Sequence, residues 1–433
     1  MDNILFIVKS HCTNRDVAEI SYLPPLGVMT ISTILCLNGY QTKIIDESVE
    51  LLTTERLLNE IERLQPIFVA ISAYTENSDE LFKMCRFLKK YAPSVKIVVG
   101  GPHATLVTDN CKKPKCVDFV SVGEGEGALL ELAEAIRSNQ KVIKFADIEG
   151  VIYLENGKFH ENDRRDTIRN LDLLPIVNRN LLPRSLESDY VTISSSRGCP
   201  GRCIYCAAPA MSGNKYRIRD IENVFLETIF ALELVKYQKD VYYIDDTFTA
   251  IIDRVRTYLD LLENSKVRYR FRCESRVDVL SKNKDVVKRL AENGCERLQY
   301  GMESGNQDVL DRIHKHMNLG DAMDLIDYTV RQGILVATSF MFGHYCDTVD
   351  TMNDTVNLMI KLNQLYGNRV QIVYGYNTPF PGTYQYEHAE ELGIRLTVSQ
   401  YKDFNMIAPI VETDNFTTRT QFEMAEKVKS ITY

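Results

Sequence analysis

Short apolar segments alternate with longer amphipathic segments over the first 140 residues, and this alternation restricts the fold more than any other feature of the sequence. The apolar segments have the length of buried strands and lie at 4–8, 42–46, 67–71, 95–99 and 119–122. The intervening segments carry apolar residues at helical spacing, at 27–38, 50–64, 77–91 and 127–138. Strands that alternate with helices predict an α/β domain with a doubly wound, Rossmann-like parallel sheet of the flavodoxin type.

Small and polar residues follow three of these strands. They are Ser72 after the third, Gly100 and Gly101 after the fourth, and Gly123 and Glu124 after the fifth. Sheets of this kind bind ligands at the carboxyl ends of their strands, and glycine lets the backbone approach a ligand closely. Ordinary strand-to-helix turns also use glycine, and no G-x-G-x-x-G follows the first strand. The residues alone therefore leave the ligand open.

The second half of the chain repeats the strand–helix pattern about six times. Strands are expected at 190–194, 241–244, 269–272, 297–300, 334–338 and 370–374, and helices near 221–236, 253–264, 284–293, 320–332 and 350–365. Six such units predict a partial TIM-like (β/α)6 barrel. Polar residues follow four strands, at 245–247, 274–276, 303–305 and 344, where a barrel places its active site. A single aspartate there could instead cap the next helix.

Three cysteines with the spacing C-x3-C-x2-C stand in the loop after the first strand of this second half. Cys199, Cys203 and Cys206 lie in the stretch SSSRGCPGRCIYCAAP. A [4Fe–4S] cluster normally takes four cysteine ligands. Three cysteines leave one iron open, and an open metal position activates a substrate or cofactor. The spacing therefore favours an iron–sulfur cluster that takes part in chemistry.

Zinc binding and disulfide formation fit the three cysteines less well. A structural zinc ion would need a fourth ligand at close spacing, and the next cysteine is Cys273, without a paired partner. A disulfide framework is not expected, because the 11 cysteines are scattered as in an intracellular enzyme and no signal peptide precedes them. A cytoplasmic location follows from the same reasoning.

The cysteine segment resembles the signature of the radical S-adenosylmethionine (SAM) superfamily, which has this spacing and an aromatic residue, here Tyr205, before the third cysteine. The resemblance implies that the open iron binds the amino and carboxylate groups of SAM. It also implies that an electron from the cluster cleaves SAM to a 5′-deoxyadenosyl radical, under anaerobic conditions.

The same resemblance assigns SAM contacts to residues at the barrel rim. Asp245 and Asp246 fall where the superfamily contacts the SAM amino group, and Glu303 in YGMESG falls where it contacts the ribose. Ser275 and Arg276 are expected to bind the SAM carboxylate or ribose, since arginine holds a carboxylate through two parallel hydrogen bonds. No residue is assigned a direct catalytic role.

Segments of the first 140 residues resemble the cobalamin (B12)-binding domain that precedes the radical SAM domain in one class of the superfamily. They are LPPLGVMTIST, ISAYT, VVGGPHAT and VSVGEGEGALLEL. The resemblance makes Ser72, Gly100, Gly101, Gly123 and Glu124 candidates for cobalamin contacts. It does not extend to the D-x-H-x-x-G motif of methionine-synthase domains, so His11 is expected to be a loop residue and not a cobalt ligand. Some members of the class have lost cobalamin, and the sequence does not decide this point.

The domain boundaries expected from these patterns are 1–140 for the cobalamin-type domain and 190–383 for the barrel. Residues 141–189 form a hairpin, turning at 155–157, followed by a linker. Residues 384–433 form a short C-terminal extension that is expected to be helical. The segment TPFPGT at 378–383 resembles a motif after the last strand in this class, and a rigid turn explains it equally well.

Several other residues carry weaker indications. Cys111 and Cys116, in CKKPKC, are expected to be free thiols in a surface loop, because charges and a proline separate them. Tyr300, Tyr374 and Tyr376 could face the cavity and relay a radical, although most tyrosines pack in cores with a hydrogen-bonded hydroxyl.

Net charge and hydropathy restrict the partners. A net charge of −8 argues against nucleic acid, because binding phosphates requires a basic surface. No segment approaches 18 consecutive apolar residues, so no membrane span is expected. The expected partners are a small-molecule or peptide substrate and an electron donor such as flavodoxin or ferredoxin.

The sequence thus predicts a radical SAM enzyme that cleaves SAM at a [4Fe–4S] cluster, with cobalamin as a further cofactor. The leading hypothesis is a cobalamin-dependent methyltransferase that acts on an unactivated carbon. The alternatives are a cyclase, rearrangement or C–C bond-forming enzyme with or without cobalamin, and, more remotely, a non-enzymatic iron–sulfur electron carrier or redox sensor. A tRNA methylthiotransferase would need further N-terminal cysteines and a basic C-terminal barrel, and neither is evident. The sequence does not identify the substrate or the oligomeric state.

Overall fold

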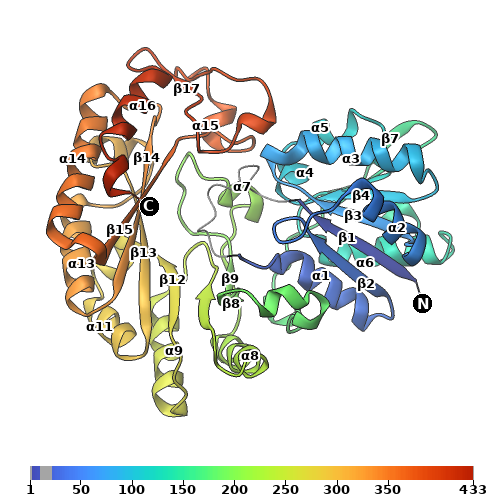
Figure 1. Ribbon diagram of the computed structural model, residues 1–433, viewed down its shortest axis with the longest axis horizontal. Coiled ribbons are helices and arrows are strands. Elements are labelled where there is room, and N and C mark those ends of the chain that lie inside the picture. Colours follow the sequence, from blue (N-terminus) through green and yellow to red (C-terminus); the bar gives the residue numbers. More distant parts are fainter. Residues whose placement is uncertain (1, 10–21, 433) are drawn as a thin grey trace. The chain divides into compact units, whose positions relative to one another are not determined.

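The computed structural model describes residues 2–9 and 22–432, which form two compact units, Met1–Tyr190 and Val191–Tyr433. Each unit has its own sheet (Figure 1). The second unit has one apolar core, and the first has two, one on each face of its sheet. Residues 10–21, which include His11, lie outside the described residues.

The first unit contains a seven-stranded sheet with the order β2-β1-β3-β4-β5-β6-β7. Its parallel strands are β1 (Asn3–Val8), β2 (Gln41–Asp46), β3 (Phe68–Ser72), β4 (Lys96–Gly100) and β5 (Phe119–Ser121). This strand order confirms the flavodoxin-type sheet that the sequence predicts. The expected hairpin forms strands β6 (Val151–Glu155) and β7 (Lys158–Glu161), and it extends the sheet because β6 pairs with β5 in the antiparallel direction.

Helices cover both faces of this sheet. They are α1 (Leu26–Leu37), α2 (Thr54–Leu64), α3 (Ser78–Tyr91), α4 (Pro102–Leu106), α5 (Thr108–Lys112) and α6 (Gly125–Arg137). Along β1, Ile4 and Phe6 enter the core that contains residues of α1 and α6, whereas Leu5 and Ile7 enter the core that contains residues of α2 and α3. Burial on both faces explains why these strands are continuously apolar.

The prediction that Cys111 and Cys116 lie in a surface loop is wrong. Their exposed fractions are 0% and 5%, and both belong to an apolar cluster that also contains Cys85. Short helix α5 accounts for the difference, because it turns Cys111 inward while Lys112 points outward and pairs with Glu161 at 2.5 Å.

The second unit contains a six-stranded sheet with the order β15-β14-β13-β12-β11-β8. The strands are β8 (Tyr190–Ile193), β11 (Asp240–Tyr243), β12 (Phe271–Ser275), β13 (Cys295–Glu303), β14 (Leu335–Phe342) and β15 (Val370–Tyr376), and β11 to β15 pair in parallel. Helices cover one face (Figure 1): α8 (Ile221–Leu234), α9 (Ile252–Ser265), α11 (Lys284–Glu292), α13 (Leu319–Arg331) and α14 (Val349–Tyr366). This is the expected partial barrel.

Two strands end later than the sequence indicates. Strand β12 begins at Phe271 and includes Ser275, and β13 continues to Glu303 through an irregular register between Gly301 and Glu303. The expected strands 269–272 and 297–300 are too short because polar residues interrupt the apolar ones beyond these positions. Such interruption is still compatible with a strand when only one face of the sheet is packed.

The three tyrosines considered as radical relays pack in the protein. The Tyr300 side chain is fully buried, and its hydroxyl lies 3.0 Å from the Thr329 hydroxyl of α13. The Tyr374 ring packs against Phe342 at 5.8 Å, and Tyr376 is buried. Tyr300 therefore faces the helices and not a cavity.

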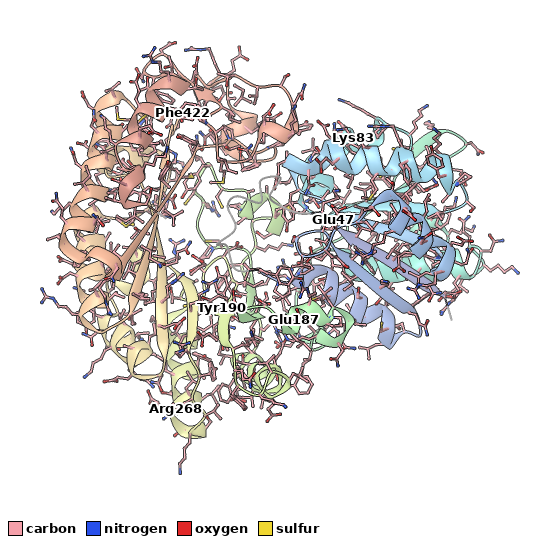
Figure 2. The ribbon with its side chains drawn as sticks, viewed as in Figure 1. Glu47, Lys83, Glu187, Tyr190, Arg268 and Phe422 are labelled. Carbon is pink, nitrogen blue, oxygen red and sulfur yellow. The ribbon has the colours of Figure 1, made fainter. Side chains whose placement is uncertain are left out.

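The C-terminal extension is not purely helical, which differs from the prediction for residues 384–433. It contains α15 (Tyr384–Glu387), a two-stranded ribbon of β16 (Arg395–Leu396) and β17 (Val411–Glu412), and α16 (Thr418–Glu426). Phe422 on α16 is labelled in Figure 2 and is 49% exposed. Thr383 caps α15 by accepting a hydrogen bond from the Tyr386 backbone N–H at 3.2 Å, so the TPFPGT segment forms a turn and a helix start. Within the described part of the chain, no helix is both long and apolar enough to cross a membrane.

Two glycines with the same backbone conformation test the packing of the second unit. Gly294 and Gly333 have φ values of +93° and +91°, but a Cβ on Gly294 would overlap the Tyr269 carbonyl oxygen, whereas nothing lies within 4 Å of one on Gly333. Both Gly→Ala changes should cost about 1 kcal/mol from the left-handed backbone. Gly294→Ala should lower the apparent midpoint of thermal unfolding further, and equal midpoints for the two variants would contradict the packing described here.

Candidate active site

The cysteine segment leaves the sheet at the carboxyl end of its first strand. After β8 the chain forms β9 (Ser196–Arg197), which pairs with β10 (Arg217–Ile218) and closes the base of the loop that carries the cysteines. Gly198 has φ +83°, and a Cβ there would overlap the Lys215 carbonyl oxygen. Glycine is therefore required where the loop begins.

The three predicted ligands, Cys199, Cys203 and Cys206, are half-buried free thiols. The Gly201 backbone N–H donates to the Cys199 sulfur at 3.4 Å, and the Ala208 backbone N–H donates to the Cys206 sulfur at 3.4 Å. Burial raises the pKa of the Cys203 thiol and raises the pKa of Cys206 to about 12. Hydrogen bonds to sulfur stabilise thiolate ligands at iron–sulfur clusters.

The backbone of the loop is also held at its centre. The Ile204 N–H donates to the Ile313 carbonyl at 3.2 Å, and the Ile204 carbonyl accepts from the Gln385 N–H at 3.0 Å. The cysteine loop is thus held in position from two sides. Ile313 lies between α12 (Gln307–Arg312) and α13, and Gln385 belongs to the C-terminal extension.

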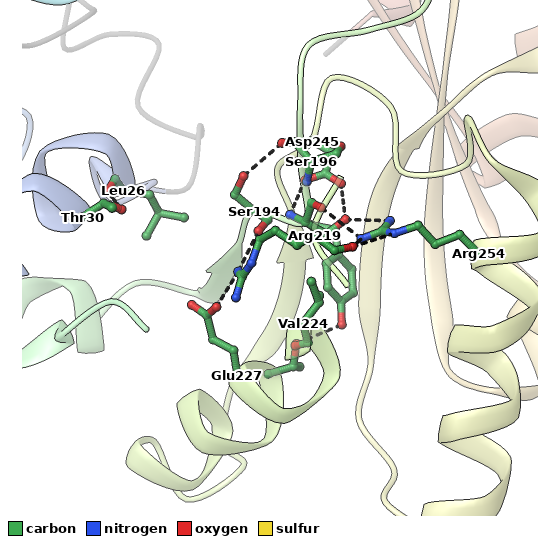
Figure 3. Close-up of polar contacts among 12 residues, drawn as sticks. Leu26, Thr30, Ser194, Ser196, Arg219, Val224, Glu227, Asp245 and Arg254 are labelled. Atoms are coloured by element: carbon green, nitrogen blue, oxygen red, sulfur yellow. Dashed lines mark hydrogen bonds and ion pairs between the residues drawn. The ribbon is translucent and has the colours of Figure 1, made fainter. Parts of the chain in front are cut away.

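Asp245 holds the segment that precedes the cysteines (Figure 3). Its carboxylate accepts hydrogen bonds from the Ser195 N–H at 2.6 Å, the Ser196 N–H at 3.1 Å and the Ser195 hydroxyl. Burial raises its pKa, and these hydrogen bonds act in the opposite direction. The Asp245 carboxylate is therefore occupied by its own chain.

Arg254 of α9 completes this network. Its guanidinium donates to the Ser195 hydroxyl at 3.1 Å, the Ser195 carbonyl at 3.0 Å and the Arg219 carbonyl at 3.2 Å. The side chain of Arg219 in turn pairs with Glu227 at 2.5 Å. Figure 3 shows these side chains converging on the loop after β8.

Asp246 differs from its neighbour because its side chain is exposed. Partial desolvation and the charge of Asp245 raise the pKa of Asp246, while the Gly198 backbone N–H favours its ionised form. Of the two aspartates, Asp246 is the one with surface available to a ligand.

Arg276 lies beside the first cysteine. Asp278 holds the guanidinium through two hydrogen bonds of 2.9 and 2.7 Å, and the Arg276 Nη1 lies 3.8 Å from the Cys199 sulfur. A Cβ at Gly201 would lie 2.7 Å from that nitrogen. Glycine at 201 therefore allows the guanidinium to approach the thiol. Ser275, the last residue of β12, is half-buried next to it.

Glu303 forms a buried ion pair with a residue that no sequence motif identifies. The Lys315 Nζ lies 2.7 Å from the Glu303 carboxylate and 3.5 Å from the Tyr205 hydroxyl. Glu303 has φ +61°, and the neighbours of Lys315, His314 and His316, have φ +57° and +51°. Three unfavourable backbone conformations thus surround one ion pair, a concentration of strain that is typical of functional sites.

His344, expected as a polar residue of the rim, is completely buried at 0% exposure. Its ring lies 5.4 Å from that of Tyr205, and among the described residues no group bonds to either ring nitrogen. Burial lowers its pKa to about 4, so the imidazole is neutral near pH 7.

The residues predicted to contact cobalamin lie at the carboxyl ends of β3, β4 and β5. Ser72 pairs in register with Gly100, and a Cβ on Gly101 would lie 2.9 Å from the Ser72 hydroxyl oxygen. A Cβ on Gly123 would meet nothing within 4 Å. The Glu124 carboxylate accepts a hydrogen bond from the Ile168 backbone N–H at 2.7 Å, so this side chain holds the segment after the hairpin.

Comparisons with known proteins agree with this geometry. Residues 20–133 match the family model for the B12 binding domain, and residues 193–359 match that for the radical SAM superfamily. The chain is 27% identical over 412 residues to an uncharacterised methyltransferase, PH0819, of Pyrococcus horikoshii, covering 93% of this chain and 86% of the relative.

The chain is a radical SAM enzyme with a B12-binding domain.

Two further proteins are similar to this chain. The anaerobic magnesium-protoporphyrin IX monomethyl ester cyclase of Cereibacter sphaeroides is 23% identical, covering 90% of this chain and 63% of the cyclase. The solved structure of the radical SAM methyltransferase TsrM from Kitasatospora setae has a TM-score of 0.79 at 16% identity, covering all of this chain and 89% of that one. The latter similarity confirms the fold.

The cysteine loop of this radical SAM enzyme fits a [4Fe–4S] cluster. Its donor set is three thiols with N–H and guanidinium donors aimed at two of the sulfurs. Among the described residues no three His, Cys, Asp or Glu side chains converge as the ligands of a single metal ion would. Each thiolate of a cube binds a different iron, so its ligands are more widely spaced.

The carboxyl edge of the sheet in the B12-binding domain presents a polar group without a partner in the described residues. The Ser121 hydroxyl, at the end of β5, is buried without a hydrogen-bond partner among the described residues, and the Ser121 Cβ lies 3.8 Å from the position of a Cβ on Gly100. An unpaired buried hydroxyl beside an open glycine edge provides a hydrogen-bonding group and room for the backbone to be approached.

The adjacent aspartates give a test of the loop-holding network. Asp245→Asn places an amide N–H₂ against backbone N–H donors and should lower the free energy of unfolding by about 1–3 kcal/mol. It should also lower the iron retained per chain after reconstitution, because the loop that begins at Gly198 loses its anchor.

Urea unfolding of the apoprotein and an iron assay after desalting measure these two effects. The matched control is Asp253→Asn in the first turn of α9, whose side chain is 90% exposed and pairs with Arg256 at 3.2 Å. It should lower the free energy of unfolding by less than about 1 kcal/mol and leave the retained iron unchanged. Equal behaviour of the two variants would contradict the assignment of Asp245.

Proposed function

We propose that this radical SAM enzyme is a cobalamin-dependent methyltransferase that methylates an unactivated carbon. The observation that carries the proposal is the order of its parts: a B12-binding domain precedes a barrel with three cysteines, and a relative named as a methyltransferase aligns over 93% of the chain. When bound, the cluster with SAM supplies hydrogen-atom abstraction, and cobalamin supplies a methyl group.

In this proposal Cys199, Cys203 and Cys206 hold the cluster. Tyr205, Asp246 and Ser275 are the groups with surface available to SAM, and Glu303 is held by Lys315 in position for the ribose. Asp245 positions the loop, since its oxygens already accept three hydrogen bonds from the chain.

Arg276 contributes charge to the site. Asp278 occupies two of its N–H groups, so the guanidinium is fixed with Nη1 toward Cys199. Burial alone would lower the pKa of Arg276, but the Asp278 carboxylate and the Cys199 sulfur raise it. A permanently charged donor at this point stabilises the negative charge of a thiolate ligand.

Ser72, Gly100, Gly101 and Gly123 are proposed to line the cobalamin site, with Glu124 shaping it through its bond to the Ile168 backbone. The proposed partners are a small-molecule or peptide substrate and an electron donor of the flavodoxin or ferredoxin kind.

A radical cyclase is the second candidate, and the similarity to the Cereibacter sphaeroides cyclase favours it. The two candidates differ in whether the methyl group of SAM reaches the product. Protein reconstituted with iron and sulfide should therefore be compared with and without hydroxocobalamin, using SAM labelled in its methyl group.

Removing any cluster cysteine should reduce SAM cleavage to background, because an incomplete ligand set cannot hold the cluster. The variants are Cys199→Ala, Cys203→Ala and Cys206→Ala, each assayed anaerobically for 5′-deoxyadenosine with a strong reductant. The matched control is Cys36→Ala in α1, a half-buried cysteine far from the other three in the sequence. This variant should retain cleavage. Cleavage retained by any of the three variants would overturn the cluster assignment.

Cobalamin binding has its own measurement. We expect about one cobalt per chain after desalting, with corrin absorbance beside that of the cluster, and cobalamin-dependent transfer of labelled methyl. Protein that retains the cluster without cobalt and turns over equally well without cobalamin would exclude the methyltransferase and leave the cyclase.

A further inference from the structure

Helices pack against one face of the sheet of the second unit, and polar side chains stand on its other face. Along β12 and β13 the residues in the helix-covered core are Phe271, Cys273, Leu298, Tyr300 and Met302, all 0–1% exposed. The residues between them are polar and half-buried. We call the face that carries them the open face, and it is formed by Arg272, Glu274, Arg297, Gln299 and Gln371 together with Tyr242.

Strand register arranges these side chains in rows. Tyr242, Arg272 and Arg297 are paired across β11, β12 and β13. Glu274 pairs with Gln299 in the next row, which continues through Ala337 to Gln371. Paired residues of parallel strands point to the same face of a sheet, so two arginines lie side by side next to a row of amides and one carboxyl group.

The side chains on β11 and β12 are already positioned. The Arg272 guanidinium lies 4.0 Å from the centre of the Tyr242 ring, and the Tyr242 hydroxyl donates to Glu274 at 2.8 Å. Stacking on an aromatic ring orients the planar guanidinium.

Arg297 lacks such partners. Within residues 2–9 and 22–432 its side chain forms no hydrogen bond and no ion pair within 4.0 Å, and Glu274 and Glu296 influence it only through longer-range electrostatics. Glu296 is instead the ion-pair partner of Arg270, at 3.4 Å. A half-buried guanidinium without a bonded partner is costly to maintain unless a ligand supplies the anion.

We propose that Arg272 and Arg297 bind an oxyanion, a carboxylate or a phosphate, at the end of the substrate remote from the reacting carbon. The assignment of this anion to the substrate rests on the proposed function. Arg272 precedes Arg276 by four residues, or about 13 Å of strand, and Arg276 lies beside Cys199. The substrate is therefore an elongated molecule with an anionic end, and Gln299 and Gln371 lie along its path.

Chemical protection of the arginines tests the site without turnover. Protein with a reconstituted cluster, kept without reductant, is treated anaerobically with phenylglyoxal, and the modification of each arginine is followed by peptide mass spectrometry. Sodium acetate and inorganic phosphate are the two probes, and sodium chloride at equal ionic strength is the reference. We expect modification of Arg272 and Arg297 to slow several-fold, with no change at Arg270.

The probes distinguish the two oxyanions, since protection by acetate alone identifies a carboxylate site and protection by phosphate alone a phosphate site. Protection by neither, or equal protection of Arg270, would overturn the proposal. SAM is a further arm: protection by SAM itself would show that the arginines hold the carboxylate of SAM, and would overturn the assignment to the substrate. Because no catalysis is required, failure of methyl transfer and failure of protection are separate results.

Variants provide a second readout on the same assay. Arg297→Gln should raise the probe concentration that gives half-protection of Arg272 about tenfold, as expected for losing one charge-assisted hydrogen bond. Arg270→Gln, the same change at an arginine that pairs with Asp240 at 2.8 Å, should leave that concentration unchanged. If Arg297→Gln does not fold, protection of the unmodified chain still decides the question.

Glu274 predicts how the protection depends on pH. Burial raises its pKa to about 7, with Asp246 acting in the same direction and Tyr242, Arg272 and Arg297 acting against it. Above pH 7 the ionised carboxylate competes with an added anion for the arginines, and below pH 7 the neutral acid does not. Protection by acetate, which stays ionised over this range, should strengthen as the pH falls from 8 to 6, and Glu274→Gln should abolish this dependence.

Discussion

The buried carboxylate of Asp245 is the constraint on which the geometry of the cysteine site depends. A carboxylate at 2% exposure is costly unless hydrogen bonds replace its water shell, and here the backbone of Ser195 and Ser196 supplies them. This arrangement ties the end of β11 to the loop that leaves β8. Since Arg254 of α9 also binds Ser195, groups from the end of β11 and from α9 together hold the chain that leads from β8 to Cys199.

Two positive charges near the cysteines are matched by carboxylates. Arg276 is paired with Asp278, and Lys315 is paired with Glu303. Burial alone would lower the pKa of Lys315, but Glu303 and the neighbouring thiols raise it, so the lysine stays charged. The site can thus keep two cations beside prospective thiolates without leaving either cation uncompensated.

Sequence patterns predict the scaffold well because its signals are local. Apolar segments such as 4–8 and 67–71 are buried on both faces, and the helices that the sequence predicts begin and end within a few residues of their expected positions. The cysteine spacing is equally local, and it predicts a loop that the structure places at the end of β8.

The interactions that position the site could not be read in the same way. Lys315 stands between two histidines in left-handed conformations, and no motif connects it with Glu303. The two adjacent aspartates look alike in the sequence, although one is buried and bonded to the backbone and the other is exposed. The prediction for Cys111 fails for a related reason: the charges around it suggest a surface loop, whereas a five-residue helix turns the neighbouring lysine outward and the cysteine inward. Each of these features depends on a segment that is distant in the sequence and packs against the residue in the fold.

One distinction between the two sheets is nevertheless present in the sequence. A parallel strand covered by apolar layers on both faces is apolar at every position, as in ILFIV of β1 and KIVVG of β4 after its first residue. In strands β12 and β13, FRCES and CERLQYGME, polar residues such as Arg272, Glu274 and Gln299 stand between the apolar ones. Since a parallel sheet gains little by leaving one face unpacked, polar residues that recur at alternate positions in adjacent strands indicate a face reserved for something other than a core. The period of the pattern therefore separates the sheet that is packed on both faces from the sheet that is packed on one.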